Sequence, residues 1–492
     1  MIRSHLALRY REIGSKVGFL LVLVSAYMLL PLAGLAAYPE EAGAAAAFAL
    51  PALAMAALGL VAWRLLHPRQ QVVLTVREGG VIVLVSWILV SIFSAWPFMR
   101  LEGLSFTQAV FESVSGWTTT GLSVVDVTGA FRITLLWRSL TQLAGGAGLA
   151  IIMLSAIAGP TGPAVSVAEG RDLLVPHVRE SAKLVMRIYS VYAVLGVLGL
   201  WLAGMDWFSA VNHAFAAIST GGFSTEPASI GHWDSPQVEA VTIVLMLLGS
   251  ISFVTIWSLI RGKLRTFLRN GEIRLVALLL PVSAVLLLLL TTRGLSGPSF
   301  EATRSAVFQA ATALTTTGFS TTGFGVWNSF GWGMIILLMV IGGGTCSTAG
   351  GIKQYRILLM AKSVGWEVRR HLLPGKAVVP YPVWVGDRKV FVSEGHLRSV
   401  GTFVFLYIAS LAAGTAVLAA HGGGLRDSLF EFASTLGTVG LSTGMTSPQS
   451  PQLVLWTQTV GMLLGRLEFF VVIVSIRKVA GDLLRIREAA AG

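Results

Sequence analysis

Four short segments combine threonine, serine and glycine in a pattern that could bind a cation through backbone oxygen atoms. They are residues 118–123 (TTTGLS), 219–224 (STGGFS), 315–320 (TTTGFS) and 437–442 (GTVGLS). Because glycine tolerates backbone dihedrals that are closed to other residues, successive carbonyl groups of such a segment can point in one direction. Four segments arranged around one axis would form rings of carbonyl oxygens that replace the hydration shell of a monovalent cation.

The four segments contain no acidic residue, which indicates the kind of cation. Channels for divalent cations usually use rings of carboxylates, so uncharged segments favour K⁺ or a similar weakly hydrated monovalent cation. The predicted ion-binding residues are Thr119, Thr120, Gly121, Thr220, Gly221, Gly222, Thr316, Thr317, Gly318, Thr438, Val439 and Gly440. The alternative is that each segment is only a helix C-cap and turn. Four copies at equivalent positions argue against that alternative.

The spacing of the segments predicts the architecture that must position them. Their anchor glycines, Gly121, Gly222, Gly318 and Gly440, are separated by 101, 96 and 122 residues, which is far too long for a solenoid. With 54% hydrophobic and 12% charged residues, the chain is too apolar for a soluble globular protein. We therefore expect an all-α polytopic membrane protein, with four parallel repeats around a pseudo-fourfold pore and a preceding two-helix unit.

Apolar stretches place two spanning helices in each repeat, with a short helix between them. The first spans are expected at 79–99, 183–204, 274–292 and 397–420, and the second at 133–158, 238–260, 331–361 and 452–481. The segments 106–117, 207–218, 303–314 and 427–436 are too short to span and too polar to face lipid, so we expect re-entrant pore helices. Two further spans, 17–37 and 46–66, precede the repeats. The predicted domains are 1–70, 71–175, 176–270, 271–390 with an intramembrane loop, and 391–492.

The pore helices also align with one another in register. Ten residues before the anchor glycine stand Phe111, Asn212, Phe308 and Phe430, and nine before it stand Glu112, His213, Gln309 and Glu431. Glu112 and the nearby Asp126 could concentrate cations at the outer mouth or be ordinary solvated charges. His213 is expected to pack or to form a hydrogen bond rather than to bind a metal.

The basic residues predict the orientation. With the N-terminal tail, residues 1–16, on the cytoplasmic side, 29 of the 36 Lys and Arg residues fall in segments on that side, as the positive-inside rule requires. The net charge of +12 therefore needs no nucleic-acid partner. Both termini are expected in the cytoplasm and the Thr/Gly segments near the outer face. Nine basic residues between Lys353 and Arg398 predict a soluble partner there, although an anionic leaflet could also account for part of that charge.

A glycine-rich run interrupts the second span of the third repeat, because each glycine costs a helix about 1 kcal/mol against alanine. The run comprises Gly342, Gly343, Gly344, Thr345, Cys346, Ser347, Thr348, Ala349, Gly350 and Gly351. It lacks the Gly-Lys-Ser/Thr ending of a phosphate-binding loop, and glycines could also serve close helix packing. We expect an intramembrane loop beneath the ion-binding segments.

Two arginines lie inside predicted spans, where a charge is costly and often functional. Arg466 stands 26 residues after Gly440, and Arg138 stands 17 after Gly121. Each could simply cap carbonyls or pair with a carboxylate such as Glu468, and for Arg138 we favour that structural role. We expect Arg466 and the glycine-rich loop to form a gate.

Further motifs show a resemblance to a known family. These motifs are Trp137-Arg138-Ser139-Leu140-Thr141-Gln142, Gly145-Gly146-Ala147-Gly148, Gly350-Gly351-Ile352-Lys353 and Gly465-Arg466-Leu467-Glu468. Together with the repeats, they resemble the TrkH branch of the Trk/Ktr/HKT potassium transporter superfamily over essentially the whole chain. The resemblance implies a homodimer in the bacterial inner membrane, one pore per protomer and a cytosolic TrkA-type nucleotide-binding ring, with no organic cofactor in this chain. The second and fourth segments depart from the Thr-Thr-Gly pattern, which puts tight discrimination between K⁺ and Na⁺ in doubt.

The predicted function is a K⁺-conducting subunit gated from the cytosol, with K⁺ bound at the Thr/Gly segments. The alternative is a K⁺ symporter coupled to another cation. Coupled transporters often have inverted repeats, whereas these repeats run parallel. An enzyme is not expected, because the sequence shows no nucleophile with a base, no metal-ligand cluster and no Walker motif. The single cysteine, Cys346, excludes an internal disulfide.

Overall fold

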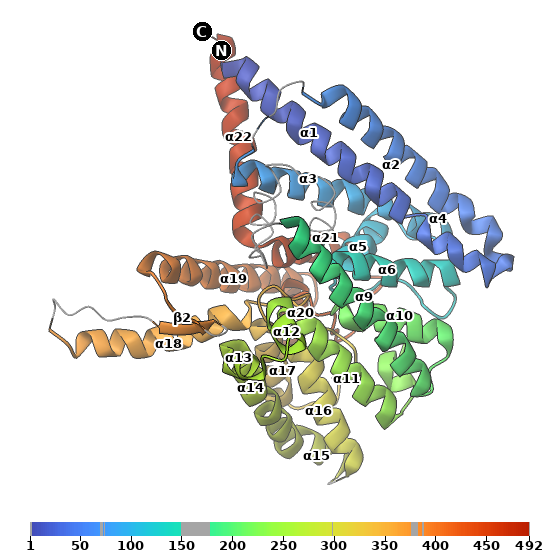
Figure 1. Cartoon of the computed structure of the whole chain (residues 1–492). Coiled ribbons are helices and arrows are strands. Elements are labelled where there is room, and N and C mark those ends of the chain that lie inside the picture. The colour runs from blue at the N-terminus through green and yellow to red at the C-terminus, as the bar shows by residue number, and fades with distance from the viewer. Residues whose placement is uncertain are drawn as a thin grey trace.

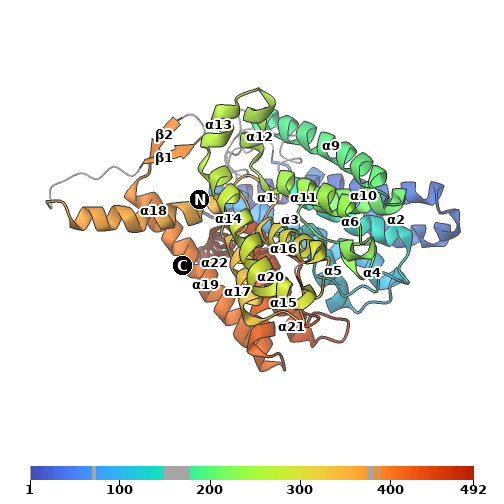
Figure 2. The same cartoon turned by 90° about the horizontal axis from the view of Figure 1, so that it is seen from below.

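The computed structural model describes residues 2–68, 72, 74–148, 178–297, 299–374, 382–385 and 388–491. These residues are almost entirely helical, which confirms the all-α polytopic class (Figure 1). In this part of the chain the exception is a short antiparallel hairpin of β1 (Pro382–Val385) and β2 (Arg388–Phe391), with Pro382 opposite Phe391. The hairpin and α18 (Gln354–His371) project from the side of the helical body (Figure 2).

The N-terminal unit is a helical pair that packs on the first repeat. Helices α1 (Ile2–Tyr27) and α2 (Ala45–Leu66) lie side by side (Figure 1), joined by the 3₁₀ helices η1 (Leu30–Ala36) and η2 (Pro39–Ala44). The part of the predicted cytoplasmic tail that the structure describes is helical, because α1 already begins at Ile2. Its basic residues are spaced along a helix that continues without a break into the apolar span.

A carboxylate from the N-terminal unit caps a helix of the first repeat. Helix α6 (Arg132–Ala147) follows Phe131, whose side chain cannot accept a hydrogen bond. Glu41 of η2 instead accepts hydrogen bonds from the backbone N–H groups of Arg132 at 2.7 Å and Ile133 at 3.0 Å. A negative charge at this end also suits the helix dipole. The unit is therefore joined to the pore repeats by a specific contact as well as by apolar packing.

Each repeat contains the expected first helix, short pore helix and second helix. The first contains α3 (Val76–Ser94), α4 (Trp96–Leu101), α5 (Phe106–Trp117) and α6, and the second α9 (Val178–Leu202), α10 (Trp207–Ile218), η3 (Ser229–His232), α11 (Pro236–Ser250) and α12 (Phe253–Ile260). The second also contains α13 (Leu264–Arg269), and the third contains α14 (Gly271–Leu287), the π-helical turn η4 (Leu288–Thr292), α15 (Arg293–Ser296), α16 (Phe300–Leu314), α17 (Ser329–Ile341) and α18. The fourth contains α19 (Glu394–Ala420), α20 (Leu425–Leu436), α21 (Gln452–Leu467) and α22 (Phe469–Ala491).

The first spans are confirmed, but two of the predicted second spans are wrong in shape. Within the described residues, six helices are long and apolar enough to cross a membrane, and these include the four first spans and the N-terminal pair. The predicted continuous spans 238–260 and 452–481 are each broken, with bends of 108° between α11 and α12 and 103° between α21 and α22. The part of the predicted span 133–158 beyond Gly148 lies outside the described residues.

All four second helices end at a similar distance after the anchor glycine. The residues at these ends are Gly148, Ile251, Gly342 and Glu468. Close packing explains the common depth: a Cβ atom added to Gly145, Gly249 or Gly465 would lie within about 2.5 Å of the carbonyl oxygen of Trp117, Ile218 or Leu436, near the end of a pore helix. Glycine at these positions lets each second helix approach the pore-helix end directly.

Candidate ion-binding site and gate

The four pore helices end in one shared backbone motif. Two residues into each Thr/Gly segment, the N–H groups of Thr120, Gly221, Thr317 and Val439 donate to carbonyls five residues earlier at 2.8–2.9 Å. The preceding residues, Thr119, Thr220, Thr316 and Thr438, donate to carbonyls three residues earlier at 3.0–3.2 Å. This pair of bonds defines a Schellman C-cap. Each segment therefore does begin with the helix C-cap and turn that the sequence analysis gave as the alternative. This geometry does not exclude ion binding.

Left-handed backbone recurs at alternate positions in all four segments. The φ angles are 56°, 51°, 55° and 49° at Thr119, Thr220, Thr316 and Thr438, and 87°, 73°, 89° and 97° at Gly121, Gly222, Gly318 and Gly440. Left-handed dihedrals are strained for a β-branched residue such as threonine, at about 1 kcal/mol or more each. In a regular β-strand, successive carbonyl groups point to opposite sides. When left-handed residues alternate with right-handed ones, successive carbonyl groups turn towards one side instead.

Each anchor glycine faces the backbone of a neighbouring Thr/Gly segment, so the four segments form a closed cycle. A Cβ atom added to Gly121 would collide with the carbonyl oxygen of Gly221, and one added to Gly222 with that of Thr317. In turn, Gly318 faces the carbonyl oxygen of Val439, and Gly440 faces that of Thr120. Each Thr/Gly segment therefore contacts the next, and the fourth contacts the first. The carbonyl oxygens of residues 120, 221, 317 and 439 each lie against the anchor glycine of a neighbouring segment.

A side chain on each pore helix fixes the outer end of its own segment. The residue nine positions before the anchor glycine contacts the serine two positions after it in all four repeats. The pairs are Glu112 with Ser123 at 2.9 Å, His213 with Ser224 at 2.9 Å, Gln309 with Ser320 at 3.2 Å and Glu431 with Ser442 at 2.7 Å. We call these four pairs the clamps. His213 thus forms a hydrogen bond, as expected from the sequence.

Glu112 does not act as a free charge at the outer mouth. Its carboxylate is fully buried, accepts a hydrogen bond from Arg138 Nε at 2.8 Å and also holds the backbone N–H of Val124 at 2.9 Å. Arg138 also reaches the second Thr/Gly segment, where it donates to the carbonyl oxygen of Ser224 at 2.9 Å. Arg138 therefore has the structural role that we favoured for it.

Asp126, in contrast, is exposed to solvent at the outer side of the first repeat. Its carboxylate accepts hydrogen bonds from the hydroxyl of Thr128 at 2.6 Å and from the backbone N–H of the same residue at 3.0 Å. These bonds lower the pKa of Asp126 below its ordinary value. The side chain therefore keeps its negative charge at neutral pH.

The glycine-rich loop lies directly beneath the Thr/Gly segments. Its Thr348 hydroxyl donates to the carbonyl oxygen of Gly249 at 2.8 Å and accepts a bond from the hydroxyl of Thr220 at 3.1 Å. The backbone N–H of Gly350 donates to the hydroxyl of Thr316 at 2.7 Å. The backbone N–H of Gly351 donates to the carbonyl oxygen of Gly437 at 3.1 Å. The loop therefore touches the second, third and fourth repeats at the inner ends of their segments.

Arg466 connects this loop to the first repeat. Its Nη1 donates to the carbonyl oxygen of Thr348 at 2.6 Å, and its Nη2 donates to the carbonyl oxygen of Gly145 at the end of α6. The arginine therefore caps carbonyls of the loop and of α6. A guanidinium group in this position places a positive charge beneath the ring of segments.

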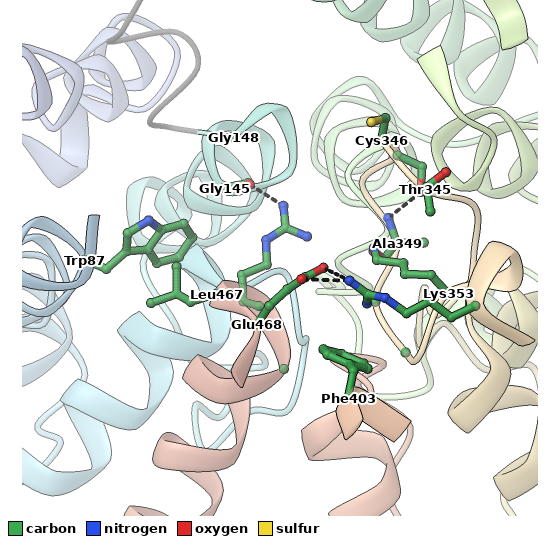
Figure 3. A pocket seen from close by; sticks show the side chains of 16 residues that line it. Trp87, Gly145, Gly148, Thr345, Cys346, Ala349, Lys353, Phe403, Leu467 and Glu468 are labelled. Carbon is green, nitrogen blue, oxygen red and sulfur yellow. Dashed lines mark hydrogen bonds and ion pairs between the residues drawn. The ribbon is translucent and has the colours of Figure 1, made fainter. Parts of the chain in front are cut away.

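Glu468 binds a different arginine at the break between α21 and α22. Its φ angle is 64°, and its two carboxylate oxygens each accept a bond from Arg356 Nη2 at 2.8 Å. Arg356 belongs to α18, directly after the loop, and its guanidinium stacks 3.8 Å from the ring centre of Phe403 (Figure 3). These groups line a small cavity of about 60 Å³ beneath the segments, together with Arg466. We call the Arg356–Glu468 ion pair the latch.

The other end of the loop is held by a buried acid on α14. The carboxylate of Glu272 accepts hydrogen bonds from the backbone N–H of Thr345 at 2.8 Å and from its hydroxyl at 2.9 Å. The backbone N–H of Gly344 donates to the carbonyl oxygen of Ser250 at 2.9 Å. The loop is therefore held at Gly344 and Thr345 as well as at Thr348, Gly350 and Gly351.

Sequence and structure comparisons identify the family. A family model named TrkH and described as a cation transport protein matches residues 46–482. The chain belongs to the TrkH family. It is 31% identical over 485 residues to the Trk system potassium uptake protein TrkH of Salmonella typhimurium, covering 95% of this chain and 98% of that protein. The Trk system potassium uptake protein TrkI of Halomonas elongata is 29% identical over 491 residues, with 95% and 96% covered.

A solved structure of the TrkH family has the same fold. The crystal structure of the potassium transporter TrkH from Vibrio parahaemolyticus superposes with a TM-score of 0.82 at 29% identity, covering 94% of this chain and 98% of that one. The family-level expectation and the polytopic helical class are thus both confirmed.

Sequence reasoning missed several residues of this TrkH-family site. It aligned the clamp positions without predicting their serine partners, and it did not single out Arg356 or Glu272. The spacing of nine before and two after the glycine was the signal that could have revealed the clamps. No comparable signal marks the latch, because Arg356 and Glu468 lie 112 residues apart and each occurs in one repeat alone.

Proposed function

We propose that the chain is the ion-conducting transmembrane subunit of a potassium uptake system, in which K⁺ passes through the ring of Thr/Gly segments as a selectivity filter. The observation that carries the proposal is the closed cycle, in which each anchor glycine faces the carbonyl oxygen of the neighbouring strand. Such oxygens can replace the water that surrounds K⁺, and no carboxylate is required. The names of the relatives, Trk system potassium uptake proteins, support the choice of ion.

The pore helices are proposed to add to cation binding. Their C-terminal ends carry the negative end of the helix dipole, and each leads directly into a Thr/Gly segment. The five domains expected from the sequence are kept in this proposal as one N-terminal unit and four pore repeats. The departures in the second and fourth segments change side chains more than carbonyl positions, since the backbone handedness is the same in all four.

The loop of residues 342–351 and Arg466 are proposed to be the gate in its closed state. The loop lies across the inner end of the filter, and Arg466 fastens it to the first repeat while opposing the entry of a cation by its positive charge. A guanidinium group has several donors in one plane and can hold two carbonyls at once. Motion of the cytoplasmic segments that releases these bonds would open the path, because a glycine-rich loop moves at low cost.

The expected setting is the bacterial inner membrane, with both termini in the cytoplasm. We propose a homodimer whose cytosolic face binds a TrkA-type nucleotide-binding ring. The surface proposed for this partner is α18 with the β1–β2 hairpin, which projects from the helical body and carries the basic segment that follows Lys353. A pull-down with purified regulatory candidates tests this assignment, and failure with every candidate would count heavily against it.

The decisive experiment measures ion flux in proteoliposomes that contain the purified protein. We expect uptake of K⁺ and Rb⁺ to exceed that of Na⁺, to follow an imposed voltage and to need no second ion gradient. Uptake that stops when a Na⁺ or H⁺ gradient is removed would support a coupled symporter instead. Equal permeation of Na⁺ and K⁺ would leave a channel but reject the potassium filter.

A further inference from the structure

Helices α1 and α22 both pack against α3 (Figure 1), and side chains of all three form a buried ionic network. Arg9 of α1 donates to both carboxylate oxygens of Glu78 of α3 at 2.5 Å. On α22, Lys478 pairs with Asp482 and lies 3.8 Å from Glu78, while the hydroxyl of Tyr10 donates to Asp482 at 2.9 Å. Glu78 and Asp482 are buried, at 2% and 3% exposure. Two cations and two anions thus neutralise one another inside the junction.

Three arginines around this network carry positive charges that no acidic side chain in the described ranges pairs with. Arg77, Arg477 and Arg485 are exposed and form no ion pair with any acid in the described ranges. The two nearest acids, Glu78 and Asp482, already hold Arg9 and Lys478. The rim of the junction therefore has an excess of positive charge, although its buried centre is neutral.

The three arginines line two adjoining hollows on the surface. The hollows have volumes of about 560 Å³ and 380 Å³, and both are bordered by Arg77, Lys478, Asp482 and Arg485. Arg477 borders the smaller hollow. The N-terminal end of α3, at Thr75 and Val76, also borders the larger one, but its cap is already filled by Glu78, which accepts from the backbone N–H of Thr75 at 2.8 Å. The excess charge of the site therefore comes from the three guanidinium groups, which suit a phosphate group.

The position of the hollow indicates where the phosphate comes from. Val76 lines the larger hollow and begins α3, whose apolar span covers residues 76–101. The hollow therefore lies just outside the apolar part of α3, in the headgroup region. Next to it, Ile473 and Ile476 of α22 are exposed at 44% and 57%, so that an apolar helix surface leads away from the charged site.

We propose that this junction of α1, α3 and α22 binds the phosphodiester headgroup of an anionic phospholipid. Basic pockets at the cytoplasmic ends of membrane helices bind such headgroups, and here the acyl chains would lie along the apolar face of α22. A bound lipid would tie α22 to α1 and α3. Since α22 begins at the residue after Glu468, the lipid would steady the helix that follows the proposed gate.

Native mass spectrometry of the purified full-length protein tests the proposal. The protein is titrated with phosphatidylglycerol and, separately, with zwitterionic phosphatidylcholine in phosphate-free buffer. We expect phosphatidylglycerol to bind at least tenfold more tightly to the wild-type protein. The combined variant Arg77→Gln, Arg477→Gln and Arg485→Gln should lose this preference. These side chains are exposed, so the variant should keep its fold, and size-exclusion chromatography with a melting curve checks this.

A matched variant controls for the loss of three positive charges. It carries Lys263→Gln, Arg265→Gln and Arg369→Gln, which are exposed residues elsewhere in the predicted cytoplasmic segments, and it should keep the lipid preference. The proposal is overturned if the junction variant binds phosphatidylglycerol as the wild type does, or if the control loses binding equally. Full competition by inorganic phosphate alone would overturn the lipid as source. Displacement of phosphatidylglycerol by an acidic peptide but not by added lipid would indicate a protein partner and would equally reject the proposal.

Discussion

The two ends of the Thr/Gly segments differ in symmetry. At the outer end every repeat has the same clamp, with a pore-helix side chain bound to the serine two residues after the anchor glycine. At the inner end the repeats diverge. The third has the long glycine-rich loop, and among the described residues only the fourth has an arginine that reaches both this loop and the first repeat.

This difference separates two physical tasks. A cation on the axis is bound best when equivalent oxygens surround it, so the groups that position the carbonyls are repeated. A gate needs one element with two discrete arrangements, and four identical loops would have to move together. We therefore expect mutations of the symmetric outer part to lower ion flux and mutations of the asymmetric inner part to raise basal flux.

The largest effect is expected at the ring itself, from Gly318→Ser. A side chain at φ 89° is strained, and its Cβ would collide with the carbonyl oxygen of Val439. A cost of about 2 kcal/mol against the ion-binding conformation corresponds to a roughly thirtyfold loss of K⁺ flux. Rb⁺ uptake into proteoliposomes measures it, together with the K⁺/Na⁺ ratio.

Gly129→Ser is the matched control, because Gly129 lies in an outer loop with open space at its Cβ position. It should conduct like the wild type. The Ser variants of Gly121, Gly222 and Gly440 should resemble Gly318→Ser, since the cycle contains all four glycines. If all four kept wild-type rates and ion ratios, these segments would not be the filter.

The next largest effect is expected at the inner end, from Arg466→Ala. The substitution removes charged hydrogen bonds to the loop and to α6, each worth about 1.5–3 kcal/mol. Basal K⁺ flux without a regulator should rise about tenfold. Arg466→Lys should lie between, because it keeps the charge and loses the planar fork. Deletion of residues 343–348 should act in the same direction as Arg466→Ala.

Arg304→Ala serves as the comparison for Arg466→Ala. Arg304 is bound to Glu239 at 2.6 Å on the outer side, away from the loop. Its loss should lower thermal stability without raising basal flux. Unchanged basal flux in folded Arg466→Ala protein would leave the arginine as a structural cap and remove it from the gate.

A smaller increase is expected from breaking the latch with Glu468→Gln or Arg356→Gln. Both partners are mostly buried, at 18% side-chain exposure, and the pair joins α18 to the start of α22. A loss of about 1 kcal/mol from the closed state would raise basal flux roughly fivefold. Arg370→Gln, which breaks the exposed pair with Glu394 at 3.6 Å, should have no measurable effect. If Arg370→Gln raised basal flux as much as Glu468→Gln or Arg356→Gln, the increase would come from the change in charge and not from the loss of the latch.

The smallest effect on flux is expected at the clamps, where the repeats differ only in chemistry. Ser442→Ala removes a hydrogen bond to the buried carboxylate of Glu431 and one from the backbone N–H of Gly444. Ser320→Ala removes one from the amide of Gln309 and one to the carbonyl oxygen of Thr322. The charged bond is worth roughly 2 kcal/mol and each neutral one roughly 1 kcal/mol. Melting curves should therefore show the larger drop for Ser442→Ala. The reverse order would mean that Glu431 is not held as a carboxylate.

The sequence predicted what is repeated and missed much of what occurs once. The Thr/Gly segments and pore helices were found because each has three counterparts at a fixed offset. The breaks at Ile251 and Glu468 were missed, since neither position has a glycine or proline and a left-handed glutamate is stabilised only by its tertiary partner. The role of Glu112 was left open, because its burial depends on Arg138 from another helix.

Glu41 has a consequence for protein engineering. A minimal pore assembled from the four repeats alone would begin after residue 70 and would leave the first amides of α6 without their acceptor. Such a truncation would lower the stability of α6, to whose Gly145 carbonyl Arg466 is bound. A designer who removes the N-terminal pair should therefore replace Phe131 with Ser, Thr or Asp, so that α6 carries its own cap.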